Sequence, residues 1–475
     1  MEFEPVIGLE IHVQLGTRTK MFCGCELSFG EPPNTRTCPV CLALPGALPV
    51  ANEQAIRNVL TIGLALECEL AERSVFHRKN YFYPDSPKAY QISQYDEPLC
   101  RGGRLAGVRI HRVHLEEDAA KLVHVGASGR IHGSDVSIVD FNRCGTPLAE
   151  IVSEPDLHTA EDARAWLELL RTTLRQTGVS DVNMEEGSLR CDANISLRPV
   201  GSAVLGTKTE LKNMNSFRFI ERGIRAEIVR QEEILRGGGE VVQETLHFDP
   251  RTEQITSLRS KEEAHDYRYF PEPDLLPVAI SQAMIDAARA AMPELPMARQ
   301  ERLQELGLTA DSARQLAWRP ELGDFFEAAL ANSIPARPPA QPLANWVTGE
   351  LVARIGEADP RATSVAPEAF AALVGMVAGR SLTPANGKVV LERLVSEGGD
   401  PTAIVEAEGL TAVSDAGELE GVVEAALAAN ADAAEKIRSG NMKAIGAIIG
   451  HVMRETNGRA DGAEVTRIVR DKLGV

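Results

Sequence analysis

Alternating apolar and polar positions predict several strands in the first 280 residues. Residues 6–15 carry apolar side chains at every second position, and the positions between them include Glu10 and His12. Residues 188–198 alternate in the same way and place Asp192 among the polar positions. Because successive side chains of a strand point to opposite faces, each segment predicts a strand with one buried face and one polar face.

Helical spacing of apolar residues predicts two helices among these strands. Thr159 and Asp162 form a capping box before the first helix, which we expect to end at Gly178. Ser216 is expected to cap a second helix that ends at the glycines 237–239. Strands in several runs with inserted helices, rather than a regular strand–helix repeat, favour an α+β fold around a β-sheet.

Beyond residue 282 the chain is rich in Ala, Leu, Glu and Arg, and strand patterns end. Residues 281–308 and 366–380 are each predicted to form a helix, and the proline-rich segment 335–342 a loop between helical units. At about 150 residues per domain, a chain of this length allows about three domains. We predict a large α+β domain over residues 1–290, an all-helical domain over 291–405 and a small helical tail domain over 406–475.

The formal net charge of the chain is −18, from 50 basic and 68 acidic residues. A molecule of this charge repels nucleic acid as a whole, so any nucleic-acid contact requires a local basic patch. Residues 436–475 carry a net charge of +4 and supply the densest such patch. No uncharged run reaches the roughly 18 residues of a membrane helix, and the acidic start resembles no targeting peptide, so we expect a cytoplasmic protein with no membrane partner.

Four cysteines occur in two closely spaced pairs, Cys23 with Cys25 and Cys38 with Cys41. Two such pairs allow four thiolates to converge on one Zn²⁺ in a closed, structural site. The alternative is four buried or incidental cysteines. A disulfide framework is not expected in a large chain of a reducing compartment.

Acidic residues near one imidazole are the candidates for a second metal site. Glu10 and His12 lie two residues apart on one strand face, about 6.5 Å from each other. Glu117 and Glu150 lie in two acidic segments that the fold could bring to this face, and a hard cation would relieve the repulsion between the carboxylates. From spacing alone, a solvated polar surface is the favoured interpretation of these residues.

Basic and aromatic residues alternate in the segment 78–85, which contains Lys79. Such a segment can stack a base and neutralise phosphate, or it can be an ordinary surface loop. Lys208 and Lys212 could likewise bind phosphates or pair with Glu210. The sequence contains no P-loop, dinucleotide-binding glycine motif or nucleophile elbow.

Eight motifs occur in order along nearly the whole chain. They are VIGLEIHVQL (6–15), RKNYFYPDSPKAYQISQYD (78–96), HLEEDAAKL (114–122), DFNRCGTPLAEIVSEPD (140–156), MEEGSLRCDANISLRP (184–199), ELKNMNSFRF (210–219), KEEAHDYRYFPEPDL (261–275) and NMKAIGAIIGHVM (441–453). Through these motifs the chain resembles the B subunit of the bacterial aspartyl/glutamyl-tRNA(Asn/Gln) amidotransferases.

The resemblance implies a ligase that phosphorylates the side-chain carboxylate of Glu-tRNA(Gln), Asp-tRNA(Asn) or both with ATP and Mg²⁺, and then amidates it. The chain has no recognisable glutaminase motif. The resemblance therefore implies a heterotrimer in which an amidase-like A subunit supplies ammonia and a small C subunit braces the pair. The cognate aminoacyl-tRNA synthetase is a further candidate partner.

The resemblance also implies roles for individual residues in the large domain, the cradle of that family. Magnesium ligands are expected at Glu10, His12, Glu117 and Glu150, zinc ligands at Cys23, Cys25, Cys38 and Cys41, and ATP phosphate ligands at Lys79, Lys208 and Lys212. Catalysis is expected to involve His12, Lys79, Glu117, Glu150 and Asp192, and tRNA binding to involve Lys436, Arg438, Lys443 and Arg454.

Two rival interpretations stay open at the level of sequence. A zinc-stabilised tRNA-binding adaptor would carry the same motifs with acidic residues that are only surface charge. A stand-alone ligase that uses free ammonia would equally lack a glutaminase motif. Co-purification with an amidase partner, and ATP-dependent conversion of Glu-tRNA(Gln) and Asp-tRNA(Asn), distinguish the three.

Overall fold

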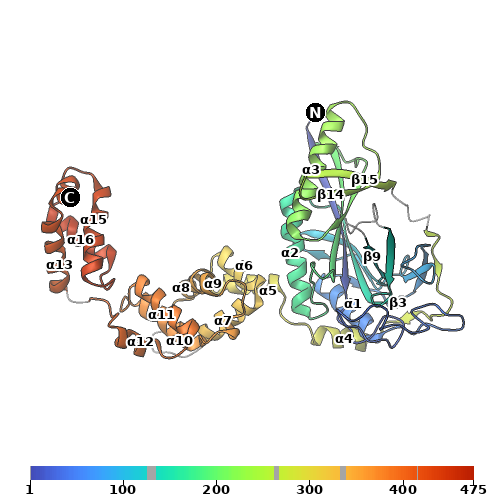
Figure 1. Cartoon of the computed structure of the whole chain (residues 1–475), viewed down its shortest axis with the longest axis horizontal. Coiled ribbons are helices and arrows are strands. Elements are labelled where there is room, and N and C mark those ends of the chain that lie inside the picture. Colours follow the sequence, from blue (N-terminus) through green and yellow to red (C-terminus); the bar gives the residue numbers. More distant parts are fainter. Residues whose placement is uncertain (1, 126–134, 261–266, 332–337, 414–415) are drawn as a thin grey trace. The chain divides into compact units, whose positions relative to one another are not determined.

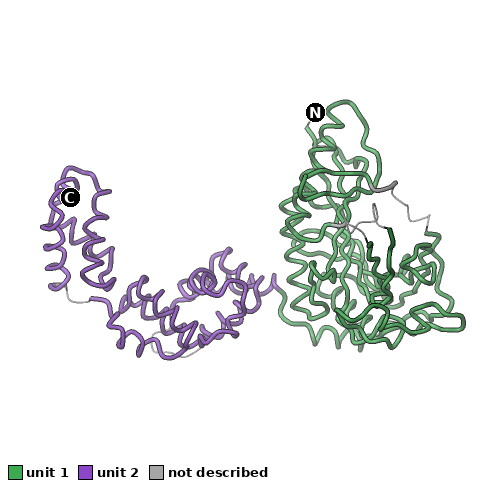
Figure 2. The backbone as a smooth tube through the Cα atoms, in the orientation of Figure 1, with its two compact units in different colours: residues 1–295 green, residues 296–475 purple. Residues whose placement is uncertain are grey.

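The computed structural model describes residues 2–125, 135–260, 267–331, 338–413 and 416–475. It divides into two compact units, Met1–Leu295 and Pro296–Val475 (Figures 1 and 2). The first unit contains every strand of the described chain, and the second is helical. This arrangement confirms the predicted α+β part followed by helices. Residues 261–266, the first six of the motif 261–275, lie outside the described ranges.

A ten-stranded sheet forms the centre of the first unit, in the order β15-β14-β13-β12-β1-β11-β8-β6-β2, with β7 paired to β8. Its middle strands β12, β1, β11 and β8 run antiparallel to their neighbours. The two strands predicted from alternation are β1 and β12. The bounds of the four strands are Leu189–Pro199 (β12), Phe3–Gln14 (β1), Pro147–Ser153 (β11) and Val108–Glu117 (β8).

The apolar face of this sheet is covered by the helices α1 (Glu53–Ala65), α2 (Ala160–Thr177) and α3 (Phe217–Arg236). The predicted caps are confirmed: Thr159 accepts the N–H of Asp162, and Gly178 ends α2 in the left-handed conformation. Ser216 caps α3 through the N–H of Phe219. The helices bury the sheet face that carries Leu9 and Ile11. They therefore leave uncovered the opposite face, which carries Glu10 and His12.

Shorter strands complete the first unit. In the three-stranded sheet β16-β4-β5, Arg78 of β4 makes two 2.7 Å hydrogen bonds to the buried carboxylate of Glu272. This pair fixes β4 and with it Lys79. The remaining bounds are β2 Glu69–Leu70, β3 Arg73–Ser74, β4 His77–Asn80, β5 Tyr90–Ser93, β6 Cys100–Arg101, β7 Arg104–Leu105, β9 Lys121–Val125, β10 Val136–Asp140, β13 Thr209–Met214, β14 Glu244–Asp249, β15 Gln254–Ser260, β16 Phe270–Pro271 and β17 Val278–Ala279.

One predicted helix is wrong in its extent. The segment 281–308 contains two helices, α4 (Gln282–Ala290) and α5 (Pro296–Glu305), rather than one. Pro293 and Pro296 lie in or next to the break, and a proline in a helix interior removes a hydrogen bond and clashes with the preceding turn. The helix predicted over 366–380 is confirmed as α10 (Pro367–Ala378).

The second unit contains two separate apolar clusters. One extends from Leu303 to Val405 and the other from Leu419 to Val469. The division into three domains stays a prediction. The loop predicted at 335–342 is wrong at its end, because α8 begins at Ala340; residues 338 and 339 lie outside any helix or strand, and residues 335–337 lie outside the described chain. The remaining elements are α6 Ala310–Trp318, α7 Pro320–Ala331, α8 Ala340–Asn345, η2 Trp346–Leu351, α9 Val352–Ile355, η3 Pro360–Ala362, α11 Pro384–Ser396, α12 Pro401–Glu408, α13 Ala416–Ala429, α14 Ala431–Arg438, η4 Met442–Ala444, α15 Ile445–Glu455 and α16 Gly462–Leu473.

Among the described residues, none of the helices combines the length and the apolar character needed to span a membrane.

Candidate functional site

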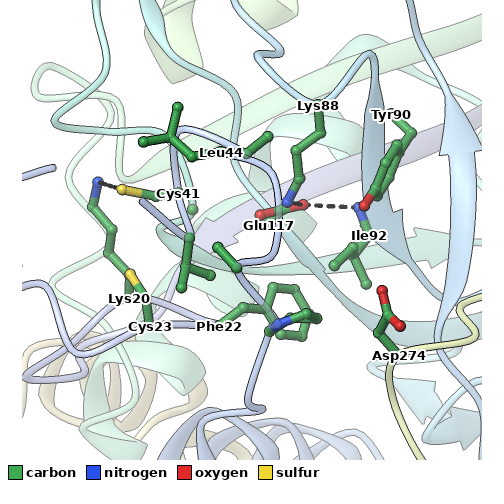
Figure 3. Close-up of a pocket in the computed structure, with 15 residues that line it drawn as sticks. Lys20, Phe22, Cys23, Cys41, Leu44, Lys88, Tyr90, Ile92, Glu117 and Asp274 are labelled. Atoms are coloured by element: carbon green, nitrogen blue, oxygen red, sulfur yellow. Dashed lines mark hydrogen bonds and ion pairs between the residues drawn. The ribbon is translucent and has the colours of Figure 1, made fainter. Parts of the chain in front are cut away.

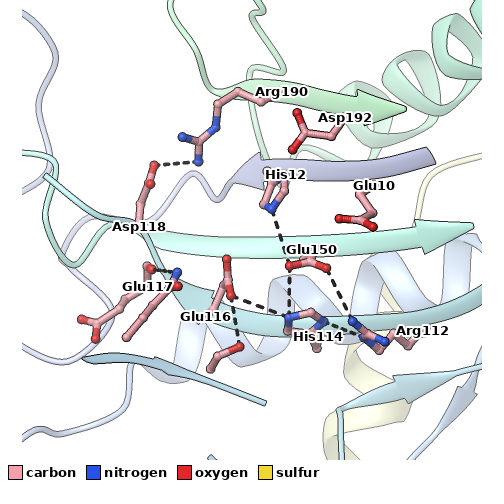
Figure 4. A network of polar contacts seen from close by, with 12 residues as sticks. Glu10, His12, Arg112, His114, Glu116, Glu117, Asp118, Glu150, Arg190 and Asp192 are labelled. Carbon is pink, nitrogen blue, oxygen red and sulfur yellow. Dashed lines mark hydrogen bonds and ion pairs between the residues drawn. The ribbon is translucent and has the colours of Figure 1, made fainter. Parts of the chain in front are cut away.

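Strand register gathers a carboxylate–imidazole cluster on the polar face of the central sheet (Figure 4). His12 of β1 lies directly opposite Glu150 of β11, and Glu150 lies opposite His114 of β8. Residues directly opposite each other in an antiparallel pair point to the same face. Glu116 joins them, because it lies two residues along β8 from His114.

The side chains of this cluster are close enough to share one cation. His12 Nε2 lies 3.5 Å from a Glu150 carboxylate oxygen, and His114 Nε2 lies 3.4 Å from the same oxygen. One ligand atom each of His12, Glu116 and Glu150 all lie within 4.8 Å of one another. Two carboxylates and an imidazole suit a hard divalent cation such as Mg²⁺ or Mn²⁺, so these residues fit the expected metal.

Glu117, which we expected among the magnesium ligands, lies outside this cluster. Its carboxylate accepts the N–H of Ile92 at 2.9 Å and pairs with Lys88. Neighbouring residues of a strand point to opposite faces, so Glu116 and Glu117 cannot both face His12. The structure thus groups Glu116, rather than Glu117, with His12 and Glu150, and the ligand set stays a prediction.

Glu117 instead lines a cavity of about 90 Å³ between β8 and the cysteine segment (Figure 3). Lys88 and Asp274 line the same cavity, and Cys23 and Cys41 form part of its opposite wall. The cavity thus brings the predicted zinc ligands and the Glu117–Lys88 ion pair into one environment.

Glu10 and Asp192 form a second acidic group next to His12. Glu10 lies two residues before His12 on β1 and therefore on the same face of the sheet. Glu10 and Asp192 are directly opposite each other on β1 and β12. Lys212 Nζ lies 2.7 Å from Asp192 and 3.2 Å from Glu210, so this group is an ion-pair network with one cation at its centre. Glu10 accepts a 2.8 Å hydrogen bond from the Asn194 amide. These contacts place Glu10 beside the three-residue metal cluster rather than within it.

The two other predicted phosphate ligands lie in different surroundings. Lys79 Nζ lies 4.8 Å from the centre of the Tyr267 ring. Burial lowers the pKa of Lys79, but the charges of Glu116, Tyr269 and Glu150 outweigh it and raise the pKa above its usual value. Lys79 is therefore a permanent cation next to the cluster, whereas Lys208 lines a separate cavity over β1 and β12.

Contacts within the cluster also shift the pKa values of His12 and Glu150. Burial disfavours the charged form of His12, but its hydrogen bond and charge interaction with Glu150, and the charge of Asp192, raise its pKa above 6.5. Burial disfavours ionised Glu150 too, yet the interactions of its carboxylate with His114, His12 and Lys79 hold the Glu150 pKa well below its usual range. A metal ion that binds through His12 must therefore compete with a proton for the imidazole.

The four predicted zinc ligands converge as expected of one tetrahedral site. All four Sγ atoms lie within 4.8 Å of one another, and the Cys38 and Cys41 sulfurs are 3.9 Å apart. Zn–S bonds of about 2.3 Å in a tetrahedron require a sulfur–sulfur distance of about 3.8 Å. A hydrogen bond from Cys23, aided by buried Lys20, lowers the pKa of Cys41 to about 4. The residues therefore fit Zn²⁺, with one thiolate already favoured.

Comparison with known proteins gives a family for nearly the whole chain. The sequence profile of the GatB/GatE catalytic domain matches residues 5–286, and that of the GatB domain matches residues 324–473. A Persephonella marina protein, named as the B subunit of an aspartyl/glutamyl-tRNA(Asn/Gln) amidotransferase, is 48% identical over 100% of both chains. A protein of the same name from Anaeromyxobacter sp. is 49% identical over 100% of this chain and 99% of its own.

The chain belongs to the family of amidotransferase B subunits. The sequence analysis did not include His114 and Glu116 among the candidate site residues, although both lie in the cluster. The alternation along this segment could have indicated them. Glu116 lies on the same strand face as His114, whereas Glu117 lies on the face of the apolar Val113 and Leu115. Lys88 had no such signal, because it lies in a turn before β5 and its partner Glu117 lies 29 residues further along the chain, in β8.

The tail of this amidotransferase family member exposes the four predicted tRNA-binding residues. Lys436 and Arg438 lie on α14, Lys443 on η4 and Arg454 on α15. Arg438 pairs with Glu435, whereas Lys436, Lys443 and Arg454 make no ion pair with a described residue. Elsewhere in the tail, Arg467 pairs with acidic residues of its own helix and Lys472 with those of α13.

We predict that Cys38→Ser removes zinc and lowers the melting temperature of the chain. Loss of one thiolate opens a closed four-sulfur site whose metal contributes directly to folding. Metal analysis should fall from about one zinc per chain to substoichiometric values. Cys68→Ser is the matched control, because Cys68 lies outside the cluster. A zinc-free wild-type chain of unchanged stability would contradict the assignment.

We also predict that Mn²⁺, used as a probe of the His12 cluster, binds more weakly as the pH falls through the raised His12 pKa. The proton on His12 competes with the metal, so the full affinity is present above this pKa and is lost below it. The loss should approach about tenfold per pH unit. Calorimetric titration at several pH values measures it, and His12→Asn should give weaker binding with a flatter pH profile. A pH-independent wild-type affinity would refute the role of His12.

Proposed function

We propose that this chain is the component of a tRNA-dependent amidotransferase that activates the side-chain carboxylate of Glu-tRNA(Gln), Asp-tRNA(Asn) or both with ATP. The activated carboxylate is then amidated with ammonia delivered by a glutaminase partner. The observation that carries this proposal is the His12–Glu116–Glu150 cluster with Lys79 beside it, in a chain of this family.

Phosphorylation gives the side-chain carboxylate of the substrate a better leaving group. Ammonia cannot displace oxide from a carboxylate, whereas phosphate is a good leaving group from an acyl phosphate. Transfer of a phosphoryl group needs positioning and positive charge rather than a protein nucleophile. A bound Mg²⁺ would neutralise phosphate charge, and His12, Glu116 and Glu150 are the residues that would hold it. Lys79 and Lys212 supply fixed cations on either side of this position.

Ammonia and the tRNA are proposed to reach the site through a partner subunit and through the tail of the chain. Ammonia is proposed to come from an amidase-like A subunit, with a small C subunit in the same assembly and the aminoacyl-tRNA synthetase as a further contact. The tRNA is proposed to contact the exposed cations of the tail. The chain before residue 436 has a net charge of −22, so it cannot hold RNA by overall charge.

We predict that His12→Ala, Glu116→Gln and Glu150→Gln each lower tRNA-dependent ATP cleavage at least about a hundredfold. Each removes a ligand whose charge compensation matters most while the phosphoryl group moves. The assay uses the reconstituted complex with Glu-tRNA(Gln) and with Asp-tRNA(Asn), and the glutaminase activity of the partner should persist. The adaptor interpretation predicts no ATP cleavage by any such complex.

Glu117→Gln is the matched control for Glu116→Gln. It changes the same side chain one residue further along β8, on the opposite face. It should keep the Mn²⁺ affinity of the wild type, whatever its effect on amidation. Equal metal loss in both variants would contradict the revised ligand set, and wild-type ATP cleavage in all three cluster variants would contradict the proposed function.

Deletion of residues 410–475 should raise the KM for Glu-tRNA and flatten its dependence on salt. Each phosphate that a lysine or arginine neutralises releases counterions, which makes the affinity fall steeply with salt. ATP binding and assembly with the partner should persist. The triple variant Lys436→Ala, Lys443→Ala, Arg454→Ala tests the patch without removing a domain, and Arg467→Ala, which breaks local ion pairs, is its control. Unchanged tRNA affinity at physiological salt would contradict the role of the tail.

A further inference from the structure

The side chain of Arg190 lies on the polar face of the central sheet, next to the carboxylate–imidazole cluster. Arg190 of β12 is directly opposite His12 of β1, so both side chains point to the same face. Figure 4 shows the Arg190 side chain extending toward Asp118, away from Glu10. The end of the cluster that lies away from Glu10 therefore carries a guanidinium.

Arg190 uses only part of its hydrogen-bonding capacity within the described ranges. Its Nη2 donates to Asp118 Oδ2 at 3.0 Å, and its Nε makes no hydrogen bond with a described residue. A guanidinium carries five N–H donors, of which the contact with Asp118 occupies one. Asp118 thus holds one side of the guanidinium and leaves other donors for a ligand.

Asp118 is fixed by contacts that do not involve Arg190. It is buried, accepts a 2.8 Å hydrogen bond from the Gln14 amide and lies 3.7 Å from Arg143 Nε. Arg143 in turn donates to the backbone carbonyls of residues 119 and 120. Because one carboxylate faces two guanidiniums, this group has a surplus of positive charge, and Asp118 can orient Arg190 without neutralising it fully.

A substrate carboxylate that approaches this face meets other negative charges. Glu116, Glu150 and Asp192 all lie on it. Like charges repel, so a further carboxylate needs a cation that is not already compensated. Burial lowers the pKa of Arg190, but the charges of Asp118, Glu116 and Asp192 outweigh it and raise the pKa above its usual value. The guanidinium therefore keeps its charge.

Arg190 suits a carboxylate better than the other cations of this face. Lys212 lies within 3.2 Å of two carboxylates, and Arg112 donates to His114 and contacts Glu150. A planar guanidinium binds a carboxylate through two parallel N–H donors, whereas a lysine acts as a point charge. The chemistry of Arg190 therefore matches the acceptor group of the proposed reaction.

We propose that Arg190 binds the side-chain carboxylate of Glu-tRNA(Gln), Asp-tRNA(Asn) or both and orients it toward the His12–Glu116–Glu150 cluster. Asp118 is then a positioning residue that holds the guanidinium. A carboxylate has about four lone-pair positions, so two N–H donors leave an oxygen able to accept the phosphoryl group. This inference rests on the proposed function, to which it adds the residue that recognises the acceptor.

The affinities of the assembled amidotransferase for Glu-tRNA(Gln) and for its product Gln-tRNA(Gln) test the inference. The two ligands share one RNA and differ only in a carboxylate or an amide, so the ratio of their Kd values isolates recognition of the carboxylate. The titration contains Mg²⁺ but no ATP or glutamine, so no reaction takes place. The wild-type complex should bind Glu-tRNA(Gln) at least about tenfold more tightly, because hydrogen bonds between charged groups are strong.

Arg190→Gln should bring this ratio close to one and lower the rate of amidation. Arg190→Lys should also lower the ratio, because lysine keeps the charge but lacks the planar pair of donors. Direct binding of ATP and the Mn²⁺ affinity of the cluster should stay near those of the wild type in both variants. Arg198→Gln is the matched control, because Arg198 lies on the same face of β12 and pairs with Glu4 instead.

The outcomes separate this inference from the proposed function. A wild-type complex that cleaves no ATP with Glu-tRNA(Gln) overturns both. With ATP cleavage intact, equal wild-type affinities for the two tRNAs, or a wild-type ratio in Arg190→Gln and Arg190→Lys, overturn the role of Arg190 alone. Loss of ATP binding at an unchanged ratio would assign Arg190 to the phosphates and also overturn it. Loss of Mn²⁺ affinity together with the ratio in both variants would show a distorted sheet and overturn it as well.

Discussion

The antiparallel register of β1 between β11 and β12 is the constraint on which the site depends. It sets His12 opposite Glu150 and Glu10 opposite Asp192, so that all four side chains rise from one face of the sheet. A slip of one residue in β1 would turn His12 into the apolar layer under the helices and bring Ile11 to the polar face. Burial of Leu9, Ile11 and Val13 against those helices therefore stabilises the same register that creates the cluster.

This arrangement concentrates charge that has little access to water. Buried carboxylates are costly unless cations or hydrogen bonds compensate them. Glu150 has His12, His114 and Arg112 within 3.6 Å, and Glu116 receives a hydrogen bond from Ser93. The contact between His12 and Glu150 raises the pKa of His12 and lowers the pKa of Glu150. Neighbouring cations and hydrogen bonds thus compensate the buried carboxylates, and a metal ion would add to that compensation.

The cysteine site and the tail follow different physical rules. The cysteine site is local, since its four ligands lie within 19 residues of sequence and need only a loop that closes on itself. The basic residues of the tail differ in whether an acidic residue pairs with them. Arg467 and Lys472 form ion pairs with acidic residues of the tail. Lys436, Lys443 and Arg454 are exposed and form no such pair within the described ranges. A count of basic residues could not separate the two groups, because the separation depends on which helices pack together.

The sequence alone determined the features that depend on neighbours along the chain. The alternation in β1 and β12, the caps at Thr159 and Ser216, and the cysteine spacing are local patterns, and the structure contains each of them. Tertiary structure decided what depends on pairing between distant strands. It placed Glu116 rather than Glu117 next to His12 and Glu150, joined Lys88 to Glu117, brought Lys79 of β4 to the cluster and placed Lys208 at a separate cavity. These choices depend on which side chains face each other across strands, and periodicity along one strand fixes the face of a residue but not its partner.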